Sequence, residues 1–372
     1  MKKFIKHPFP VLFMCSITLM ALWTFFGQSK TYSENEKRIL AEFPPFTWES
    51  IASGEFQDGL ETYVSDHISG RDFFVGLSAY FDKLMGKNAL KDIYFAKDGY
   101  LINAPKTDAD TSFRKNMNNI SAFTAKSGIP STLMIVPSAG YIMKDKLPLN
   151  HKSYRDDELF KTASDLTQNI RFFDTRVIIY DSYKAGDDVY YHTDHHLTSL
   201  GSYTLYGEYC NLMGIDYPDR DDYTVETVSG FYGTTYSGSG YFMEKSDALE
   251  IWDLGLDVKV TFEDGKTADT MFFKDHLKNM DMYPVYLDGN HSYVRIENPK
   301  AKGGNLLIIR DSYAQNMAPF LAYNYKNIHM LDMRYYRGSM KEFLEDKDID
   351  EILYLYGIDT LITDESTSWL LI

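Results

Sequence analysis

The feature that most constrains the fold is a regular alternation of short apolar runs and amphipathic stretches after Asp108. Strands and helices that alternate at these lengths indicate βαβ units around a parallel sheet. The elements predicted in this part are a helix over 112–127, a strand over 132–136, a helix over 155–169, a strand over 177–180 and a helix over 199–213 with Thr198 as its N-cap.

The alternation is interrupted between about residues 217 and 300, where Gly-rich turns and the run 258–262 predict an antiparallel, β-rich insertion. It resumes with Asn305–Ile309, whose continuous apolar character is typical of a buried parallel strand. Two further strands, over 328–331 and 352–355, and a helix over about 339–345 are predicted after it. The chain after residue 110 is therefore expected to be one α/β domain that carries an insertion.

The first 30 residues combine a lysine-rich start with a long apolar run. The uncharged stretch 7–28 holds about 20 apolar residues, which is long enough to span a bilayer with the lysines on the cytoplasmic side. We expect an uncleaved signal-anchor through residues 8–27, which makes this a single-pass protein of the cell membrane with an extracytoplasmic carboxyl-terminal domain. The alternative is a signal peptide that is cleaved near Ser29, which gives a secreted protein.

Residues 31–110 are expected to form a separate amino-terminal region made of a linker, helices and a hairpin. The proline-broken stretch 35–50 indicates an extended linker. Residues 56–84 have helical apolar spacing that is broken at Gly70, so two helices are predicted. Residues 93–102 are typical of a hairpin with Asp-Gly at its turn.

The net charge limits the possible binding partners, and the cysteine content limits the possible disulfides and metal clusters. The net charge of −15 and pI of about 5.0 disfavour nucleic acid and anionic lipid surfaces as partners. Cys15 lies inside the predicted membrane span, which leaves Cys210 as the single cysteine outside it. Neither an internal disulfide nor a cysteine-based metal cluster is therefore expected. No cofactor is predicted.

Ser312 follows the predicted strand 305–309 and precedes a helix-compatible stretch. The turn from a strand to a helix lies at the carboxyl edge of an α/β sheet, where functional groups gather. A hydroxyl there lies beside the positive end of a helix, which can stabilise an oxyanion. Ser312 can also serve simply as the N-cap of that helix, and these residues alone leave both interpretations open.

The sequence Asp194-His195-His196 supplies the other groups that a nucleophilic serine needs. These are an imidazole that takes the proton and a carboxylate that orients the imidazole. Asp194 and His196, two apart in an extended loop, are expected to point to one side and His195 to the other. The loop can instead provide only capping and solvation. A metal site that includes His192 is disfavoured, since ligands so crowded in sequence rarely complete a tetrahedral site.

Several stretches together resemble the bacterial DHHW family. The central one is Thr193–His196, with Tyr190-Tyr191 before it and Thr198–Gly201 after it. Others that resemble the family in the same order are 70–72, 96–101, 288–293, 309–314 and 332–336. The resemblance covers nearly the whole chain after residue 35. One departure is clear, because the family motif ends in Trp and this chain has Leu197 at that position.

The DHHW family is similar to the SGNH-hydrolase-like proteins of alginate O-acetylation. The resemblance implies a three-layer α/β/α domain over 111–372 with the β-rich insertion at about 217–300. It also implies a triad of Ser312 as nucleophile, His196 as base and Asp194 as orienting carboxylate. Candidates for substrate or oxyanion contacts are Tyr313, Arg310, Asn290 and His195. Asn290 also fits a plain Asp-Gly-Asn turn, and Arg310 and Tyr313 also fit an ion pair and a half-buried ring.

The implied activity is that of an extracytoplasmic O-acyltransferase or esterase, with O-acetyl as the expected group. Its expected partners are a cell-envelope polysaccharide and a membrane-bound protein that donates the acyl group. The alternative is a non-catalytic cell-envelope protein that binds glycan or an assembly partner on the same scaffold, which Leu197 favours. A separation of Ser312 and His196 beyond hydrogen-bond reach would exclude the triad. A role for Asp311 as the base is a weaker hypothesis.

Overall fold

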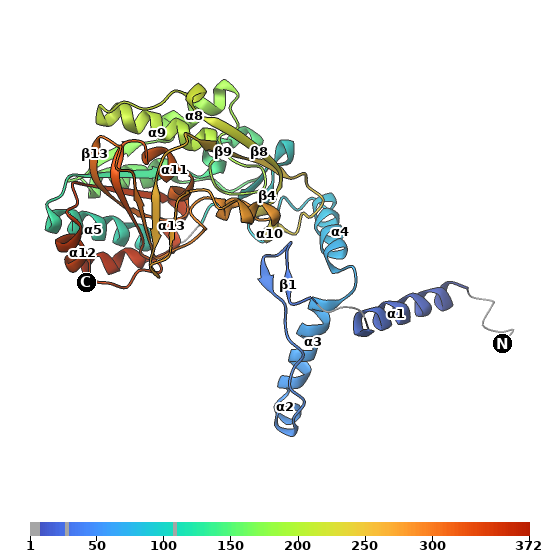
Figure 1. Cartoon of the computed structure of the whole chain (residues 1–372). Coiled ribbons are helices and arrows are strands. Elements are labelled where there is room, and N and C mark those ends of the chain that lie inside the picture. The colour runs from blue at the N-terminus through green and yellow to red at the C-terminus, as the bar shows by residue number, and fades with distance from the viewer. Residues whose placement is uncertain (1–7, 27–29, 107–109) are drawn as a thin grey trace. The chain divides into compact units, whose positions relative to one another are not determined.

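The computed structural model describes residues 8–26, 30–106 and 110–372 (Figure 1). The chain forms two compact units. Unit 1 comprises the described residues up to Leu90 together with Tyr236–Glu244, and unit 2 comprises Lys91–Thr235 and Lys245–Ile372. The lysine-rich start and the cleavage position near Ser29 lie outside the described residues.

Unit 1 is mainly helical. The break predicted at Gly70 is confirmed, because this residue has φ of 73° and separates two helices. A short helix that begins inside the predicted linker and ends at Ser53 was not expected, and a capping box at Thr47 starts it. No helix among the described residues combines the length and apolar character needed to cross a membrane. The elements are α1 Pro8–Phe26, β1 Tyr32–Ser33, β2 Arg38–Ile39, α2 Trp48–Ser53, α3 Glu55–His67, α4 Arg71–Leu84 and β3 Ala89–Leu90.

Unit 2 is built on an eight-stranded sheet with the order β11-β10-β12-β14-β13-β15-β6-β7. The five strands from β14 to β7 are parallel, which confirms the parallel sheet predicted from the alternation. These strands are β6 Ser131–Val136, β7 Arg171–Asp174, β13 Gly303–Arg310, β14 Tyr325–Asp332 and β15 Glu351–Gly357.

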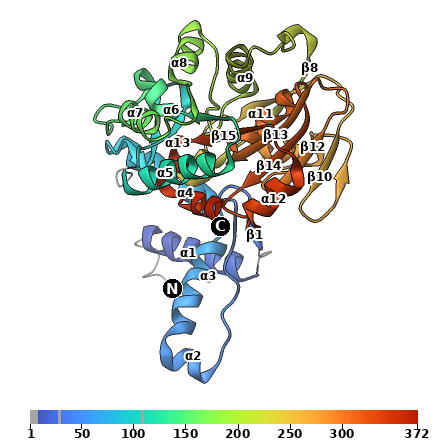
Figure 2. The ribbon, with the colours of Figure 1, turned by 90° about the vertical axis from the view of Figure 1, so that its left-hand side faces the viewer.

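Helices cover both faces of this sheet, which makes a three-layer α/β/α arrangement. Figures 1 and 2 show α9 and α11 on one face and α5 and α12 on the other. The predicted helices 112–127, 155–169, 199–213 and 339–345 are confirmed. The helices of unit 2 are α5 Asp110–Ser127, α6 Ala139–Ile142, α7 Asp156–Leu166, α8 Arg176–Ala185, α9 Ser199–Met213, α11 Tyr313–Leu321, α12 Met340–Lys347 and α13 Ile358–Thr363; α10 Thr234–Ser239 begins in this unit.

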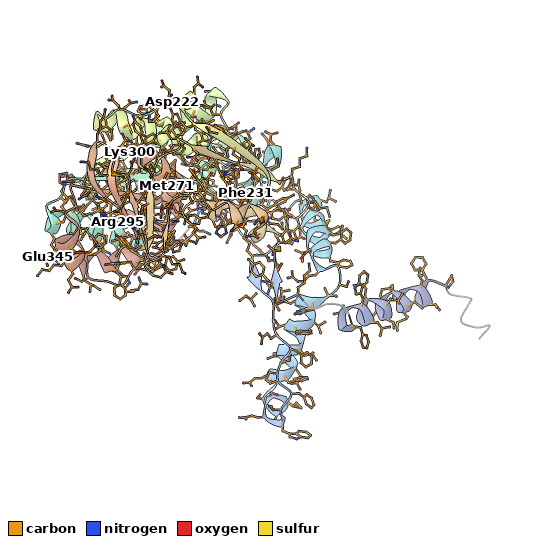
Figure 3. The ribbon with its side chains drawn as sticks, in the orientation of Figure 1. Asp222, Phe231, Met271, Arg295, Lys300 and Glu345 are labelled. Carbon is orange, nitrogen blue, oxygen red and sulfur yellow. The ribbon has the colours of Figure 1, made fainter. Side chains whose placement is uncertain are left out.

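The region 217–300 contributes antiparallel strands to two sheets. Strands β8 (Thr224–Phe231) and β9 (Asp247–Asp253) pair only with each other among the described strands. Strands β10 (Lys259–Phe262), β11 (Thr267–Ala268) and β12 (Tyr293–Glu297) instead extend the central sheet, which is therefore mixed. Phe231 of β8, labelled in Figure 3, is fully buried in a second apolar cluster of this region.

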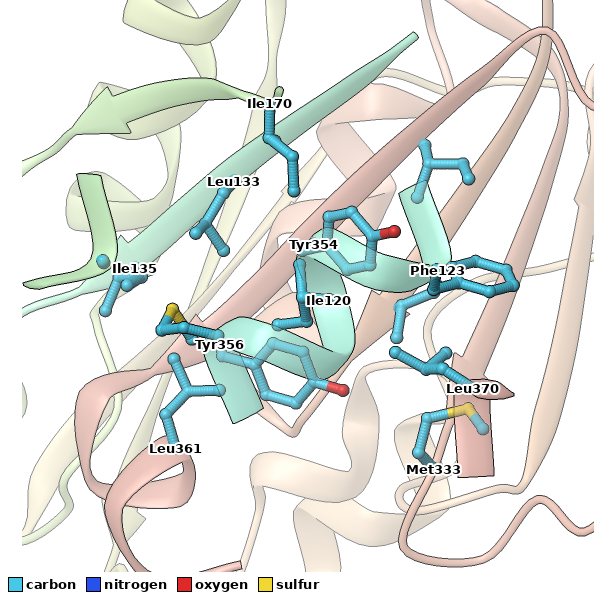
Figure 4. Close-up of a cluster of buried hydrophobic side chains, with 14 of the residues drawn as sticks. Ile120, Phe123, Leu133, Ile135, Ile170, Met333, Tyr354, Tyr356, Leu361 and Leu370 are labelled. Carbon is cyan, nitrogen blue, oxygen red and sulfur yellow. The ribbon is translucent and has the colours of Figure 1, made fainter. Parts of the chain in front are cut away.

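The main core lies between the sheet and α5, α7, α12 and α13. Figure 4 shows Ile120 and Phe123 of α5 against Leu133, Tyr354 and Tyr356 of the strands. The central strand β13 contributes alternate residues to the two faces of the sheet, and all of its residues from 306 to 310 are buried. Burial on both faces explains why this strand has a continuous apolar run instead of an alternating one.

The predicted strand over 177–180 is wrong, because these residues lie in α8. The strand that pairs with β6 is β7, which comes earlier in the chain and ends at Asp174. The side chain of Asp174 accepts a hydrogen bond from Arg176 N–H (3.1 Å), which turns the chain, and Gly186 ends the helix with φ of 101°. The β-branched run suits a helix here because it has one buried side chain, Ile179.

The predicted hairpin over 93–102 is confirmed as β4 (Ile93–Phe95) and β5 (Leu101–Asn103). Asp98 and Gly99 have φ of 59° and 82°. A tight turn with two successive positive φ angles explains the Asp-Gly pair, because Gly adopts such angles without strain and Asp does so more readily than most residues.

We expect the side chains of α8 to differ sharply in their contribution to stability. Val177 is 65% exposed and Ile179 is fully buried. Ile179→Ala should lower the free energy of unfolding by about 2–5 kcal/mol, whereas Val177→Ala should change it by no more than about 0.5 kcal/mol. Urea denaturation of the two variants measures both values. Equal losses in both variants would support the strand instead of the helix.

His329 of β14 should make the protein less stable in mild acid. It is 2% exposed, and its Nδ1 lies 2.8 Å from the Tyr293 hydroxyl. Burial, helped by Arg295 and Lys347, lowers the pKa of His329 to about 4. Between pH 6.5 and 4 the unfolded chain therefore binds a proton that the folded chain does not. The stability that this histidine contributes above pH 6.5 is lost as the pH falls, by about 2–3 kcal/mol at pH 4.5.

The measurement is urea denaturation of the wild type and His329→Asn at pH 7 and pH 4.5. The variant lacks the titrating group, so its stability should fall less between the two pH values. A fall of the same size in both proteins contradicts the assignment to His329.

Candidate active site

Ser312 lies at the carboxyl edge of the parallel sheet, in the turn between β13 and α11. Its φ of −69° and ψ of −18° are helical, and its side chain makes no capping hydrogen bond. The hydroxyl Oγ instead lies 2.7 Å from Nε2 of His196, which is 116 positions away in the sequence. The side chain of Ser312 is therefore directed at the imidazole, so the capping role does not account for it.

The imidazole of His196 is held on its other side by Asp194. Nδ1 of His196 lies 2.5 Å from Oδ1 of Asp194, and the same oxygen accepts a hydrogen bond from His196 N–H (2.8 Å). Both side chains are buried, with exposures of 4% and 3%. A proton on Nδ1 satisfies the carboxylate and leaves Nε2 free to accept the proton of the serine hydroxyl. The structure thus brings Ser312, His196 and Asp194 together in one hydrogen-bonded chain.

The second carboxylate oxygen of Asp194 is bound by Thr234, a residue that the sequence analysis did not identify. Oδ2 accepts hydrogen bonds from Thr234 N–H (2.6 Å) and Thr234 Oγ1 (3.0 Å). The neighbouring Gly233 allows this close approach, because a Cβ at that position would lie 2.2 Å from Oδ2. Neither residue belongs to a pattern that marks it in the sequence.

The loop that carries Asp194 and His196 is fixed at both ends. Tyr190 and Leu197 form an isolated antiparallel bridge that closes it. Asp247 of β9 accepts hydrogen bonds from His192 N–H (2.9 Å) and Thr193 N–H (2.7 Å). The segment from 192 to 196 bends between these anchors and is not extended.

The bend explains why the predicted direction of His195 is wrong. Its ring does not project to the opposite side but packs against His196, with ring centroids 3.8 Å apart. Nδ1 of His195 lies 2.5 Å from Thr234 Oγ1. Since that hydroxyl donates to Asp194, it can accept the His195 proton, and His195 thereby joins the same hydrogen-bond network.

The aromatic side chain beneath the imidazole is Tyr283, which the sequence analysis also missed. Its ring is parallel to that of His196, with centroids 3.9 Å apart and planes inclined by 10°. Its hydroxyl donates a hydrogen bond to the Ser312 carbonyl (3.1 Å). Burial raises the pKa of Tyr283 well above its ordinary value, so this phenol remains a donor. Leu197, at the position of the family Trp, is buried on the bridge to Tyr190.

Tyr313 and Arg310 both have partners that give them structural roles. The Tyr313 hydroxyl donates to the His195 carbonyl (2.7 Å), and its ring packs edge-on against His196. Arg310 is fully buried, with Nη1 3.7 Å from Asp332 Oδ2 and Nη2 donating to the His291 carbonyl (3.2 Å). These contacts match the ion pair and the half-buried ring considered for the two residues.

Asp311 is engaged on both of its carboxylate oxygens. Oδ1 accepts the Tyr313 N–H (3.0 Å), and Oδ2 accepts Gly357 N–H (2.8 Å) and Thr360 Oγ1 (2.6 Å). The carboxylate therefore joins β13 to β15 and α13, so it is poorly placed to act as a base. The Tyr313 N–H is also occupied, which removes it as an oxyanion donor.

Asn290 lies in a turn and contacts the first turn of α11. The three residues before it, Leu287, Asp288 and Gly289, have φ of 56°, 58° and 87°. Asn290 Oδ1 accepts a hydrogen bond from Gln315 Nε2 (3.0 Å). The turn predicted here is present, and the amide nitrogen of Asn290 is not used in this contact.

A small cavity of about 20 Å³ adjoins the network, with room for about one water molecule. Asp194, His195 and Tyr313 form part of its wall, together with residues that follow β6 and β15. Asp359 lies on the same wall, and burial raises the pKa of this carboxyl to about 6. The cavity thus lies beside the triad at the carboxyl edge of the sheet, with both polar and apolar side chains in its wall.

Asp194, His195 and His196 offer ligand atoms within 4.8 Å of one another, a spacing at which a metal ion can be held. The same atoms already have hydrogen-bond partners. Asp194 Oδ1 bonds His196 Nδ1, and His196 Nε2 bonds Ser312. The geometry therefore favours an activated hydroxyl over a metal centre.

Comparisons with known proteins show a family and a shared fold. The family model described as DHHW protein matches residues 95–331. Among solved structures, the chain is similar to a DHHW family protein from Eubacterium siraeum, with 19% identity and a TM-score of 0.65 over 75% of this chain and 95% of that chain.

A second similar structure is that of Bacillus cereus PatB1 with a sulfonyl adduct, at 20% identity and a TM-score of 0.62 over 74% of this chain and 97% of that chain. At these identities the likeness shows a shared fold. A comparison with curated protein sequences gave no match.

We expect Gly233→Ala to lower the reactivity of the Ser312 hydroxyl without unfolding the protein. The added methyl group must displace the Asp194 carboxylate, which releases His196 from its orientation. The rate at which phenylmethanesulfonyl fluoride modifies Ser312, followed by mass spectrometry, should fall about 100-fold. Gly76→Ala is the matched control, because its Cβ would meet nothing nearer than 3.8 Å. An unchanged rate in Gly233→Ala would show that Asp194 does not set the reactivity of Ser312.

Proposed function

This chain belongs to the DHHW protein family, and we propose that its site transfers acyl groups from one oxygen atom to another. The observation that carries the proposal is the hydrogen-bonded chain Ser312–His196–Asp194, with 2.7 Å and 2.5 Å between successive partners. A serine next to an imidazole that is oriented by a buried carboxylate is the arrangement that activates a hydroxyl for attack on a carbonyl.

The first half of the reaction forms an acyl-enzyme. His196 Nε2 takes the proton of Ser312 as Oγ bonds to the acyl carbon of an ester. Asp194 holds the Nδ1 proton and stabilises the imidazolium. When the tetrahedral intermediate collapses, the bond to the leaving oxygen breaks and that oxygen receives the proton from His196. The products are an ester of Ser312 and an alcohol.

The negative charge on the carbonyl oxygen needs hydrogen-bond donors. The Ser312 N–H has no acceptor among the hydrogen bonds of the described residues, and it adjoins the start of α11. The amide nitrogen of Asn290 is the second candidate, since its oxygen is turned toward Gln315. We therefore assign the oxyanion contacts to Ser312 N–H and Asn290 in place of Tyr313 N–H.

In the second half, an acceptor hydroxyl gives its proton to His196 as its oxygen bonds to the acyl carbon. The bond from that carbon to Ser312 Oγ then breaks, Oγ takes the proton back from His196, and the acylated acceptor leaves. A sugar hydroxyl as acceptor makes the protein an O-acyltransferase, and water makes it an esterase. Transfer in preference to hydrolysis requires that water be excluded while the acyl-enzyme waits. The near-complete burial of Asp194 and His196 suits that requirement.

The substrate and location in this proposal follow the family resemblance. They are O-acetyl transfer to a cell-envelope polysaccharide, a membrane-bound protein as acyl donor, and an extracytoplasmic site behind the apolar stretch 8–27. The alternative is a non-catalytic cell-envelope protein in which the same residues form only a polar cluster. A separation of Ser312 and His196 beyond hydrogen-bond reach would have excluded the triad, and the 2.7 Å between them supports the catalytic proposal. The ring stacked on the imidazole is supplied by Tyr283, and Leu197 is buried on the bridge to Tyr190, which weakens the argument from the missing Trp.

We expect residues 31–372 to hydrolyse or transfer the acetyl group of 4-nitrophenyl acetate. Ser312→Ala and His196→Ala should each lower kcat/KM by at least about 1,000-fold, because either change removes nucleophilic catalysis as a unit. Release of nitrophenol measures turnover, and an acetylated Ser312 in rapidly quenched samples identifies the intermediate. Turnover that persists in both variants would exclude the triad.

Two controls distinguish the serine mechanism from the two other hypotheses, Asp311 as the base and a metal centre. Asp311→Asn preserves the serine and tests the weaker hypothesis of Asp311 as base; it should retain most of the turnover in protein that remains folded. Treatment with a chelator should leave the rate unchanged. Activity that is lost with chelator and restored by Zn²⁺ would replace the serine mechanism with a metal centre.

A further inference from the structure

The structure places Tyr283 against two members of the triad at once. Its ring is stacked on the imidazole of His196, and its hydroxyl donates to the backbone carbonyl of Ser312. These two contacts come from one side chain that is 6% exposed. Tyr283 thus connects the base to the backbone of the nucleophile by a route independent of Asp194.

The segment that carries Tyr283 is firmly held. The short 3-10 helix Tyr283–Val285 is flanked by backbone hydrogen bonds from Phe273 N–H to Val285 O (2.7 Å) and from Leu287 N–H to Met271 O (2.9 Å). Tyr286, three residues on, donates its hydroxyl to the Glu250 carbonyl of β9 (2.6 Å). A ring on such a support keeps its orientation, which is what a positioning group requires.

The hydroxyl contact completes the support of the peptide that follows the nucleophile. The carbonyl of Ser312 accepts from Tyr283, and the N–H of the same peptide group, on Tyr313, donates to Asp311. Both ends of this peptide are therefore fixed. The two bonds therefore restrain the ψ angle of Ser312 and the position of the backbone from which its side chain projects.

The stacked ring is suited to the charge that forms during catalysis. When His196 accepts the serine proton, a planar cation lies flat on the negative face of the phenol ring. The other titratable groups that face His196 are Asp194, His195 and Tyr313. Of these, Asp194 supplies the opposite charge in the ring plane, and Tyr283 supplies favourable electron density across the ring face.

We propose that Tyr283 is a positioning residue of this site, whose ring supports the His196 imidazolium and whose hydroxyl fixes the Ser312 backbone. The inference rests on the proposed acyl transfer and adds to it a residue that determines the efficiency of proton transfer. Its role is separate from acyl or sugar binding, so it acts on kcat and leaves KM nearly unchanged.

The test compares Tyr283→Phe, which keeps the ring, with Tyr283→Leu, which removes it. With 4-nitrophenyl acetate, kcat should fall about 3-fold in the Phe variant and about 30-fold or more in the Leu variant, with KM within about 2-fold in both. Without the ring, the imidazolium loses its proton more readily. The acid limb of the kcat profile should therefore move to lower pH by about half a pH unit in the Leu variant and stay in place in the Phe variant.

Tyr354→Leu is the matched control, because Tyr354 is also a buried tyrosine, lies in the main core, and has a hydroxyl that bonds Thr124. It should lower the melting temperature without moving the pH profile. Equal losses of kcat in the Phe and Leu variants, or a pH limb that moves in the Phe variant, would overturn the role of the ring. The Phe comparison holds even where the Leu variant does not fold.

Modification of Ser312 by phenylmethanesulfonyl fluoride distinguishes failure of this inference from failure of the proposed function. If Ser312 of the wild-type protein is modified but the protein turns over no ester, that result contradicts the proposed function and does not contradict the role of Tyr283. In that case the modification rate should still fall from wild type to Phe to Leu. A rate that is the same in all three proteins overturns the inference, whatever the activity toward esters.

Discussion

The geometry of the site depends on the need of one buried carboxylate for hydrogen bonds. Asp194 is 3% exposed, and a charge removed from water to that extent is stable only when donors surround it. The donors come from its own loop, through the N–H and Nδ1 of His196, and from Thr234. The same hydrogen bonds that satisfy Asp194 therefore also hold the imidazole, whose Nε2 lies 2.7 Å from Ser312 Oγ.

A second buried carboxylate, Asp311, holds the turn that carries Ser312, as Asp194 holds the imidazole of His196. It accepts three hydrogen bonds that join the end of β13 to β15 and α13. It is adjacent in sequence to Ser312 but has a structural role, and it is not part of the hydrogen-bonded chain of Ser312, His196 and Asp194. The two acidic residues near Ser312 therefore have different roles. The hydrogen-bond partners of Asp194 make it the residue that orients His196, and those of Asp311 make it a support of the turn.

The sequence allowed prediction of those parts that depend on local pattern. Apolar runs and caps defined the strands 132–136 and 305–309 and the helix 199–213, and the turn after a buried strand identified Ser312. The run 177–180 was misassigned because a β-branched stretch reads alike in a strand and in a helix with one buried face. Thr234 and Tyr283 could not be predicted, because each contacts the triad from a distant part of the chain. Such a contact produces no periodic pattern in the sequence. His195 was misplaced because the bend of its loop is set by Asp247, more than 50 positions away.

The strand order of the sheet also determines how much of the chain must be made before β15 can pair with β13 and β6. β15 lies between β13 and β6, and its partner residues on β6 are roughly 220 positions earlier in the chain. Non-local pairings of this kind form slowly, because the entropy of closing so long a loop must be overcome first. Strand β6 can pair with β7 early, but its other edge remains without a partner until β15 has been synthesised. The turn that carries Ser312 therefore lacks two of its supports, the hydrogen bonds from Gly357 N–H and Thr360 Oγ1 to Asp311, until most of this sequence has been made.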